Sequence, residues 1–450
     1  MKPKTQYEEP QLFQSRLDQI INLKHPLCLL AQGIDWEYFE QKFGKCYIDQ
    51  VGRPGIATRL MVSLHYLKHA YNESDESVVV RFLENPYWQY FAGLTYFAHQ
   101  LPINPSSMTR WRQRIGEVGI DELLTVILNV AIDSGELKAS SINHINVDTT
   151  VQEKAITYPI DGKLYYHMLL KLVGLAGDCD ITLRQSYTRL SKAALIRQGR
   201  YAHAKQMKRS HREVKKLKIY LGRVYRDIKR QSEGADGALV EALAMAERLL
   251  NQSRNDKHKL YSLHAPEVEC ISKGKAHKRY EFGVKVGLAS TAKDNWIIGI
   301  RTFPGNPYDG HTLQETMNNV AHHLRFEPRY VNVDQGYRKH DYQGNAEINI
   351  VSNRKMKQAT RAERNWLKRR SAIEPIFGHL KSDNRMGRNY LKGAEGDHIN
   401  AVLCASGYNM RKLLKVFFLP KFLSQILGQI FYKKLYLNPN RQNYAYFLCT

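Results

Sequence analysis

Acidic residues and long apolar runs are both scarce in this sequence. The 450 residues include 67 Lys and Arg but 43 Asp and Glu, which gives a formal net charge of +24. Such an excess favours a polyanionic partner, either nucleic acid or an anionic membrane surface. No run of about 18 apolar residues occurs, and the most apolar late segment, 416–432, is interrupted by Pro420 and Lys421. We therefore expect nucleic acid and no membrane as the partner.

Cysteine is also rare, and its positions exclude two classes of small stabilised domain. The six cysteines are scattered, without the paired spacing of a zinc site or a disulfide framework. Residues 1–10 are polar and lack the apolar core of a signal peptide. These features predict a protein of the reducing cytoplasm. Hydrophobic residues make up 43% of the chain, enough to fill the cores of about three domains.

Two short segments share one pattern and end on the same residue type. Residues 145–148 and 331–334 each alternate β-branched with polar residues and finish on Asp148 and Asp334. Alternation of this kind is typical of a half-buried strand. Both carboxylates should therefore lie where a strand leaves the core.

A third acidic residue, Glu374, lies downstream between two cations. Arg370 precedes it by four residues and Lys381 follows it by seven, so on a helix all three would fall within about 40° of one another. Pro375 fits the first turn of that helix, where its missing N–H costs little. Arg370 should then precede the regular helix.

Three carboxylates placed in this way suit metal-dependent phosphoryl transfer. Hard cations such as Mg²⁺ take oxygen ligands and keep several waters, so a few carboxylates suffice to hold them. Two such ions can stabilise the attacking and the leaving oxygen at phosphorus. We therefore predict that Asp148, Asp334 and Glu374 bind two Mg²⁺ ions, with Mn²⁺ as a substitute.

With its flanking residues, this acidic set resembles the signature of bacterial insertion-sequence transposases of the IS4/IS5 kind. Arg370 and Lys381 stand at the signature positions around the glutamate, while Leu367, beside Trp366, replaces the tyrosine usual three residues before the arginine. The resemblance to IS5-type transposases also covers the segments 147–154, 305–311 and 333–337.

The resemblance implies a DNA transposase that binds the inverted repeats at the ends of its element, cleaves there and transfers the strand to target DNA. Arg370 and Lys381 would hold phosphates near the site. A homodimer is expected in the DNA complex because two ends must be joined, and the protein would work in the bacterial cytoplasm at the nucleoid. Two alternatives stay open: a catalytically silent DNA-binding descendant of a transposase, and an RNase H-like nuclease.

Asp309 and His311 are a rival pair of candidate site residues. They follow Asn306 and Pro307, and Asp309 precedes Gly310, so the segment has the composition of a turn. We expect turn chemistry there rather than a catalytic role.

The N-terminal 140 residues read as a helical DNA-binding region. Several short helices are followed by an arginine-rich one, which resembles a helix-turn-helix module whose second helix enters the major groove. Arg110, Arg112 and Arg114 are the candidate DNA contacts. The alternative is that Trp111 belongs to the core and that the arginines form a solvated face.

A long basic helical stretch, about 165–265, separates the first acidic strand from the later strands. Between positions 189 and 230 there are fifteen Lys and Arg but two acidic residues, while apolar residues recur at three- and four-residue steps. This predicts an amphipathic helix with a cationic face that binds the phosphate backbone. The candidate contacts are Lys208, Arg209, Arg212, Lys215 and Lys216.

The predicted fold class is α/β. The order of elements, with the insertion removed, is that of an RNase H-like core in which the first and fourth strands are neighbours. The expected domains are a helical DNA-binding region (1–140), an RNase H-like catalytic domain with the helical insertion (141–400), and a C-terminal helix and tail (401–450).

Overall fold

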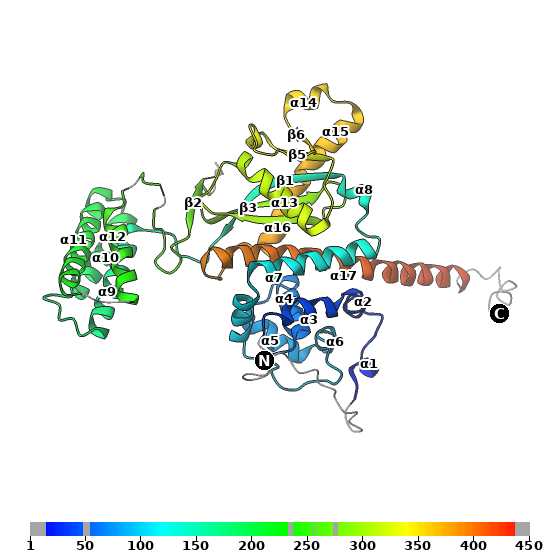
Figure 1. The fold of residues 1–450 in the computed structure, drawn as a ribbon, viewed down its shortest axis with the longest axis horizontal. Coiled ribbons are helices and arrows are strands. Elements are labelled where there is room, and N and C mark those ends of the chain that lie inside the picture. The colour runs from blue at the N-terminus through cyan, green and yellow to red at the C-terminus, as the bar shows by residue number, and fades with distance from the viewer. Residues whose placement is uncertain are drawn as a thin grey trace.

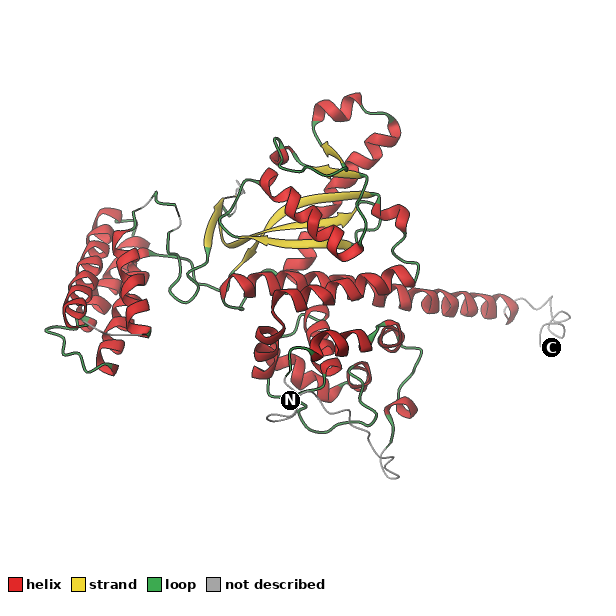
Figure 2. Cartoon of the chain, in the orientation of Figure 1, coloured by secondary structure: helices red, strands yellow, loops and turns green. Residues whose placement is uncertain are grey.

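The computed structural model describes residues 15–47, 55–232, 237–253, 255–257, 259–272 and 278–436. A mixed sheet lies at the centre, helices from the N-terminal part pack below it, and a separate group of helices stands to one side (Figures 1 and 2). The chain is thus a mixed α/β protein, as the sequence predicts. Within the described part, no helix is both long enough and apolar enough to cross a membrane.

The central sheet is built around β1 and β3. Its strand order is β2-β3-β1-β5-β6, and β4 pairs with β3 beside β2. β1 is antiparallel to β3 but parallel to β5, which is in turn parallel to β6. The expected adjacency of the two acidic strands is therefore confirmed. The strands are β1 (His144–Glu153), β2 (Glu269–Ser272), β3 (Tyr280–Thr291), β4 (Ile297–Phe303), β5 (Tyr330–Val333) and β6 (Glu347–Ile350).

The hairpin of β3 and β4 is confirmed, and its turn shows why the chain reverses there. Asn295 has a φ of 58°, a left-handed conformation that asparagine adopts more readily than most residues. Trp296 follows it and is buried, so the turn is fixed to the core.

The described part of the N-terminal region consists of helices joined by turns and loops. Ser74 begins α5 with a capping box, in which its hydroxyl accepts from the Ser77 N–H at 3.0 Å. Gly116, at φ 63°, kinks α7 into two helical pieces. The helices are α1 (Leu17–Ile20), α2 (Pro26–Gly33), α3 (Trp36–Gly44), α4 (Thr58–Ala70), α5 (Asp75–Glu84), α6 (Pro86–Phe91), α7 (Ser106–Asp133) and α8 (Ala139–Ile142).

The basic insertion forms four helices with a hydrophobic core of their own. Leu217, Leu221, Val224 and Ile228 on one face of α11 are buried in that core, which confirms the predicted apolar stripe. The bundle stands to one side of the sheet in Figure 1. Its helices are α9 (Asp161–Asp178), α10 (Thr188–His203), α11 (Met207–Gln231) and α12 (Ala238–Asn251).

The remaining helices cover the sheet and connect it to the N-terminal region. α17 and α7 lie side by side beneath the sheet, and the Asn409 side chain of α17 bonds the backbone of Ile297 in β4 at 3.1 and 2.7 Å. α17 begins before the domain boundary expected near residue 400, and the tail after residue 436 lies outside the described residues. The helices are α13 (Leu313–Leu324), α14 (Asn353–Gln358), α15 (Arg361–Lys368), α16 (Ile373–Asp383) and α17 (Gly393–Tyr436), with 3-10 turns η1 (Asp309–Thr312), η2 (Gln335–Tyr337) and η3 (Arg369–Ala372).

Candidate active site

The two aspartates meet at one end of the parallel strand pair. The register of β1 and β5 places Asn146 opposite Asn332, so Asp148 and Asp334, each two residues further on, lie at the same end of neighbouring strands. Asp148 is still within β1, whereas Asp334 follows β5 and caps η2, its Oδ1 accepting from the Gly336 N–H at 2.8 Å. The hydrogen-bond pattern of the sheet thus brings together two residues that are distant in sequence.

Glu374 reaches the same place from α16. Pro375 lies in the first turn of this helix, and Arg370 belongs to the preceding 3-10 turn η3, as the sequence predicts. Ile373 and Ile376 are buried and fix the helix against the core. The Glu374 side chain is 67% exposed, so the glutamate faces solvent beside the aspartates.

One guanidinium lies among all three carboxylates. Arg370 Nη2 is 2.7 Å from Asp148 Oδ2 and 3.6 Å from Asp334 Oδ2, and its Nη1 is 3.7 Å from Glu374 Oε1. The Asp148 side chain is 14% exposed and that of Arg370 is 19% exposed, so this ion pair is the well-shielded part of the cluster. Arg370 therefore neutralises part of the negative charge that the three carboxylates concentrate here.

Lys381 lies further along α16 and contacts another acidic residue. Its Nζ is 3.5 Å from Glu281 Oε1 on β3, and the Glu281 side chain is 4% exposed. The lysine thus connects the end of α16 to the sheet. Its side chain is 22% exposed, and its part in holding a DNA phosphate stays a prediction.

Asp309 provides a fourth carboxylate next to the cluster. Its Oδ1 accepts from Lys285 Nζ at 2.8 Å and from Thr149 Oγ1 at 3.0 Å. A Cβ placed on Gly336 would lie 3.2 Å from Asp309 Oδ2 and 2.9 Å from Asp334 Oδ1, so Gly336 leaves room for both acids. The sequence predicts turn chemistry for Asp309, and η1 is indeed a turn, but the turn also brings this carboxylate to the site. The sequence feature that could have indicated Asp309 is the segment 305–311, which contains it and resembles IS5-type transposases.

The Tyr337 side chain is buried next to these acids. Burial raises the pKa of the Tyr337 hydroxyl well above its ordinary value, and the charge of Asp148 raises it further. The phenol therefore stays neutral beside the cluster. The sequence signal for this tyrosine was its place at the end of the segment 333–337, which resembles IS5-type transposases.

Aromatic stacking fixes the segment that leads to Arg370. The Trp366 ring lies on His144 with centroids 4.0 Å apart, and His144 also stacks on Tyr330 at 4.5 Å. The Asn146 side chain donates to the Arg369 carbonyl at 2.9 Å. Leu367, at the position of the usual tyrosine, is buried. Both acidic strands therefore hold the turn that carries Arg370.

The N-terminal arginines divide into structural and exposed residues. Arg112 is not available for DNA, contrary to the prediction, because its side chain is 3% exposed and bonds both oxygens of Asp75 at 3.0 and 2.6 Å. Arg110 and Arg114 are exposed, and the Arg114 guanidinium lies 4.7 Å from the centroid of the Tyr47 ring. Trp111 is buried in the core, as the alternative interpretation expects.

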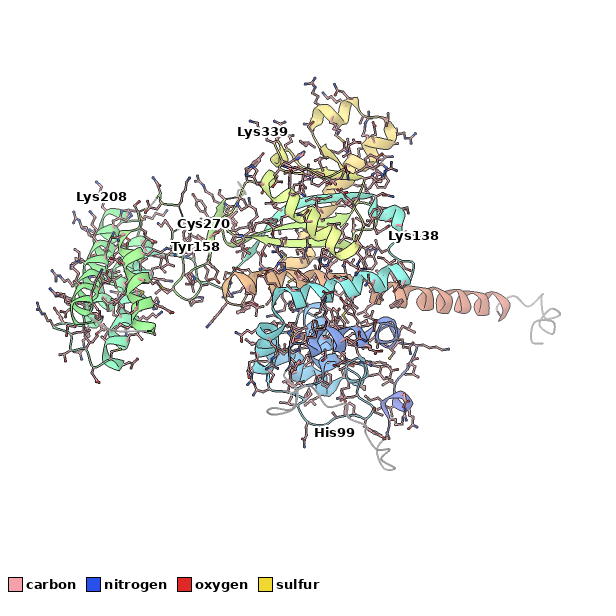
Figure 3. All side chains as sticks on the ribbon, in the orientation of Figure 1. His99, Lys138, Tyr158, Lys208, Cys270 and Lys339 are labelled. Atoms are coloured by element: carbon pink, nitrogen blue, oxygen red, sulfur yellow. The ribbon has the colours of Figure 1, made fainter. Side chains whose placement is uncertain are left out.

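The predicted cations of the insertion are exposed on α11. Figure 3 shows Lys208 on the bundle that stands apart from the sheet. The Lys216 amino group contacts Glu213 at 2.7 Å, and Arg209 Nη1 donates to Gln206 at 3.0 Å. The remaining members of the set are exposed as well: Arg212 and Lys215. This face is thus strongly cationic.

The three carboxylates around Arg370 are the candidate ligands for a metal ion. Among the described residues, no three Asp, Glu, His or Cys side chains are arranged as ready metal ligands. At the triad, the guanidinium of Arg370 lies between the carboxylates. Their oxygens are nevertheless the hard donors that divalent cations such as Mg²⁺ and Mn²⁺ prefer.

Two protein families and one curated protein are similar to parts of this chain. Residues 15–114 match the family described as Transposase domain (DUF772), and residues 257–410 match the family described as Transposase DDE domain. The second match contains Asp334 and Glu374. A protein of Rhizobium meliloti, named uncharacterized protein ORF8 in nfe locus, is 52% identical over 195 residues, which cover 43% of this chain and 94% of that protein. No solved structure matches.

Both family matches carry the name transposase, and the second also carries the name DDE. Enzymes of this family generally use divalent metal ions to cut and join DNA. The chain therefore belongs to the DDE transposases of insertion sequences.

Proposed function

We propose that Asp148, Asp334 and Glu374 are the catalytic carboxylates of this transposase and hold two Mg²⁺ ions, which Mn²⁺ can replace. The observation that carries the proposal is the position of one side chain: the Arg370 guanidinium lies within 4 Å of all three acids. The two strands and the helix that carry these carboxylates are distant in the sequence, so only the tertiary structure brings the three acids around one cation.

The exposures of the three acids suit a site that must admit both metal and DNA. The Asp148 side chain is 14% exposed, that of Asp334 37% and that of Glu374 67%, so the site is anchored on one side and open on the other. The longer contacts of Arg370 are those to Asp334 and Glu374, and these are the contacts that metal binding would replace. Released from them, the guanidinium can hold a phosphate oxygen through two parallel hydrogen bonds.

The protein itself positions the groups and supplies no covalent nucleophile. When bound, the metal ions activate water or the 3′-hydroxyl and stabilise the leaving oxygen. Asp148 stays fixed by the sheet, while Glu374 can adjust because its side chain is exposed. Lys285 balances the charge of Asp309, which limits the negative potential that an incoming phosphate meets.

We further propose an RNase H-like core and membership of the IS5 group. The order β4-β3-β1-β5-β6, with two antiparallel and then two parallel pairings, supports that core. The motif segments 147–154, 305–311 and 333–337 support the group, and the first two also contribute Thr149 and Asp309 to the contacts described above.

The other parts of the chain would serve DNA binding and assembly. We assign the recognition of the inverted repeats to the N-terminal 140 residues, with Arg110 and Arg114 as candidate contacts. We assign backbone binding to the cationic face of the insertion. A homodimer is expected in the DNA complex because two ends must be joined, and the enzyme would work on the bacterial nucleoid in the cytoplasm.

An excision assay in cells tests the assignment of the three acids. A reporter element carrying the ends that flank the gene is supplied with the wild-type chain or with Asp148→Asn, Asp334→Asn or Glu374→Gln. Each of these variants should reduce excision to the level of cells without the protein, because each removes one charged oxygen donor. Glu315→Gln is the matched control, since Glu315 is exposed on α13 and pairs with Arg301 away from the site. Wild-type excision by any of the three variants would refute the assignment.

A further inference from the structure

A small cationic pocket lies on the insertion bundle, away from the triad. It has a volume of about 200 Å³ and opens between the loop that joins α9 to α10 and one face of α11. Four arginines, one tyrosine and one aspartate carry the argument: Arg184, Tyr187, Arg223, Arg226, Asp227 and Arg230. Arg223 and Arg226 lie on the basic helix that the sequence predicts to bind the phosphate backbone, and the pocket joins them to Arg184 and Tyr187 of the preceding loop.

The pocket has an excess of positive charge. Its one carboxylate, Asp227, is 10% exposed and lies 3.3 Å from Arg230 Nη2. The same carboxylate lies 3.7 Å from Arg184 Nε and accepts a hydrogen bond from the Arg184 backbone N–H at 3.0 Å. Within the described parts of the chain, no carboxylate lies within 4 Å of Arg223 or Arg226. Among the described residues, the guanidiniums of Arg223 and Arg226 therefore have no carboxylate as a counter-ion in the pocket.

The arrangement is built into the fold. Tyr187 adopts a left-handed conformation with φ 55°, and its ring stacks on Tyr220 with centroids 5.0 Å apart. The Arg223 guanidinium lies 5.6 Å from the centroid of the Tyr187 ring and donates to its hydroxyl at 3.1 Å. A Cβ at Gly222 would lie 3.2 Å from Arg226 Nη1, so the glycine gives this guanidinium room along the helix.

The pocket continues a longer cationic stripe. At about 100° per residue, Arg223, Arg226 and Arg230 fall on the same side of α11 as Lys208 and Lys215. At about 1.5 Å per residue the stripe from Lys208 to Arg230 is roughly 33 Å long, close to one turn of duplex DNA at about 34 Å. A binding site of this length fits a polymer of phosphates better than it fits a small phosphorylated molecule.

We propose that this pocket binds a backbone phosphate of the DNA duplex and anchors about one helical turn of DNA along α11. The ligand chemistry is a phosphodiester, bound by the paired N–H groups of Arg223 and Arg226. This inference rests on the proposed DNA-binding role of the insertion and locates its main contact.

The test measures DNA binding against salt concentration in the Glu374→Gln background, so that the result does not depend on cleavage. The double variant Arg223→Ala/Arg226→Ala is compared with Arg189→Ala/Arg200→Ala, which removes the same charge from exposed positions on α10. Each lost phosphate contact should lower the slope of log K against log salt by about 0.9. We therefore expect a decrease of about 0.9 for the pocket variant, which loses this one phosphate contact, and no change for the control. Circular dichroism verifies that both variants keep their helices.

Two results would overturn the proposal. An equal decrease in slope for both double variants would mean that the bundle contributes diffuse charge without a defined site. An unchanged slope in the pocket variant, together with calorimetric binding of inorganic phosphate to Glu374→Gln that the pocket variant loses, would assign the pocket to a free phosphate ligand. Failure of the wild-type chain to cleave DNA with Mg²⁺ would refute the proposed active site and leave this binding result intact.

Discussion

Replacing Asp75 by asparagine should destabilise the N-terminal region strongly. Asp75 accepts two bonds from Arg112 and one from Lys68 at 2.8 Å, and the side chains of these two cations are 3% and 7% exposed. Burial would raise the pKa of Asp75, but the hydrogen bond and charge of Arg112 and the charge of Lys68 hold it well below its usual range. The variant keeps the shape of the side chain and leaves two buried cations without their carboxylate. Breaking a buried pair in this way costs about 3–5 kcal/mol.

Thermal and urea unfolding followed by circular dichroism would measure this loss. A change of 1 kcal/mol in the free energy of unfolding shifts the Tm of a domain of about 150–250 residues by roughly 2–4 °C, so the Tm of the N-terminal region should fall by about 6–20 °C. Arg110→Ala is the matched surface control and should change stability by less than about 0.5 kcal/mol. If Asp75→Asn costs less than about 1 kcal/mol, or if Arg112→Met weakens DNA binding without any loss of stability, then the structural role of Arg112 is refuted.

Two further predictions concern acid stability and the sheet. Burial lowers the pKa of His323 to about 4, so from about pH 6.5 down to about pH 4 the unfolded chain binds a proton that the folded chain does not. The free energy of unfolding should therefore fall by up to about 1.4 kcal/mol per pH unit on acidification. Urea unfolding at several pH values should show a shallower fall for His323→Gln than for the wild type. The same pH dependence in both proteins would contradict this role of His323. Gly283→Ala should cost about 1–3 kcal/mol or more, because a Cβ there would overlap the backbone oxygen of Gln152 across the β1–β3 pairing. Gly199→Ala in α10, with no described atom within 4 Å of the added Cβ, should instead stabilise the chain by up to about 1 kcal/mol; equal Tm values for the two variants would disprove the packing argument.

The elements that the sequence predicts well are those with a local cause. Alternating β-branched residues before Asp148 and Asp334 predicted strands, and hydrogen bonding then placed them side by side. The apolar steps of α11 predicted a buried stripe, and Leu217 and Leu221 lie in it. In each case a short periodic pattern determines which face is buried, so the pattern alone is informative.

The features that the sequence did not predict depend on a partner far away in the chain. Arg112 resembled a surface cation until the fold placed Asp75, 37 positions away, against it. Asp309 resembled a turn residue, and only the tertiary structure brings Lys285 to it. Local composition carries no information on such pairings, because the closing contact is made by another element.

The most direct test of the central claim is cleavage of a plasmid that carries the ends flanking the gene, with wild type and Glu374→Gln compared in Mg²⁺, Mn²⁺ and EDTA. We predict that the wild type nicks at the ends with either metal and not in EDTA, while the variant binds the same DNA and does not cut it. Equal cleavage by both proteins, or cleavage that persists in EDTA, would contradict the metal-binding triad.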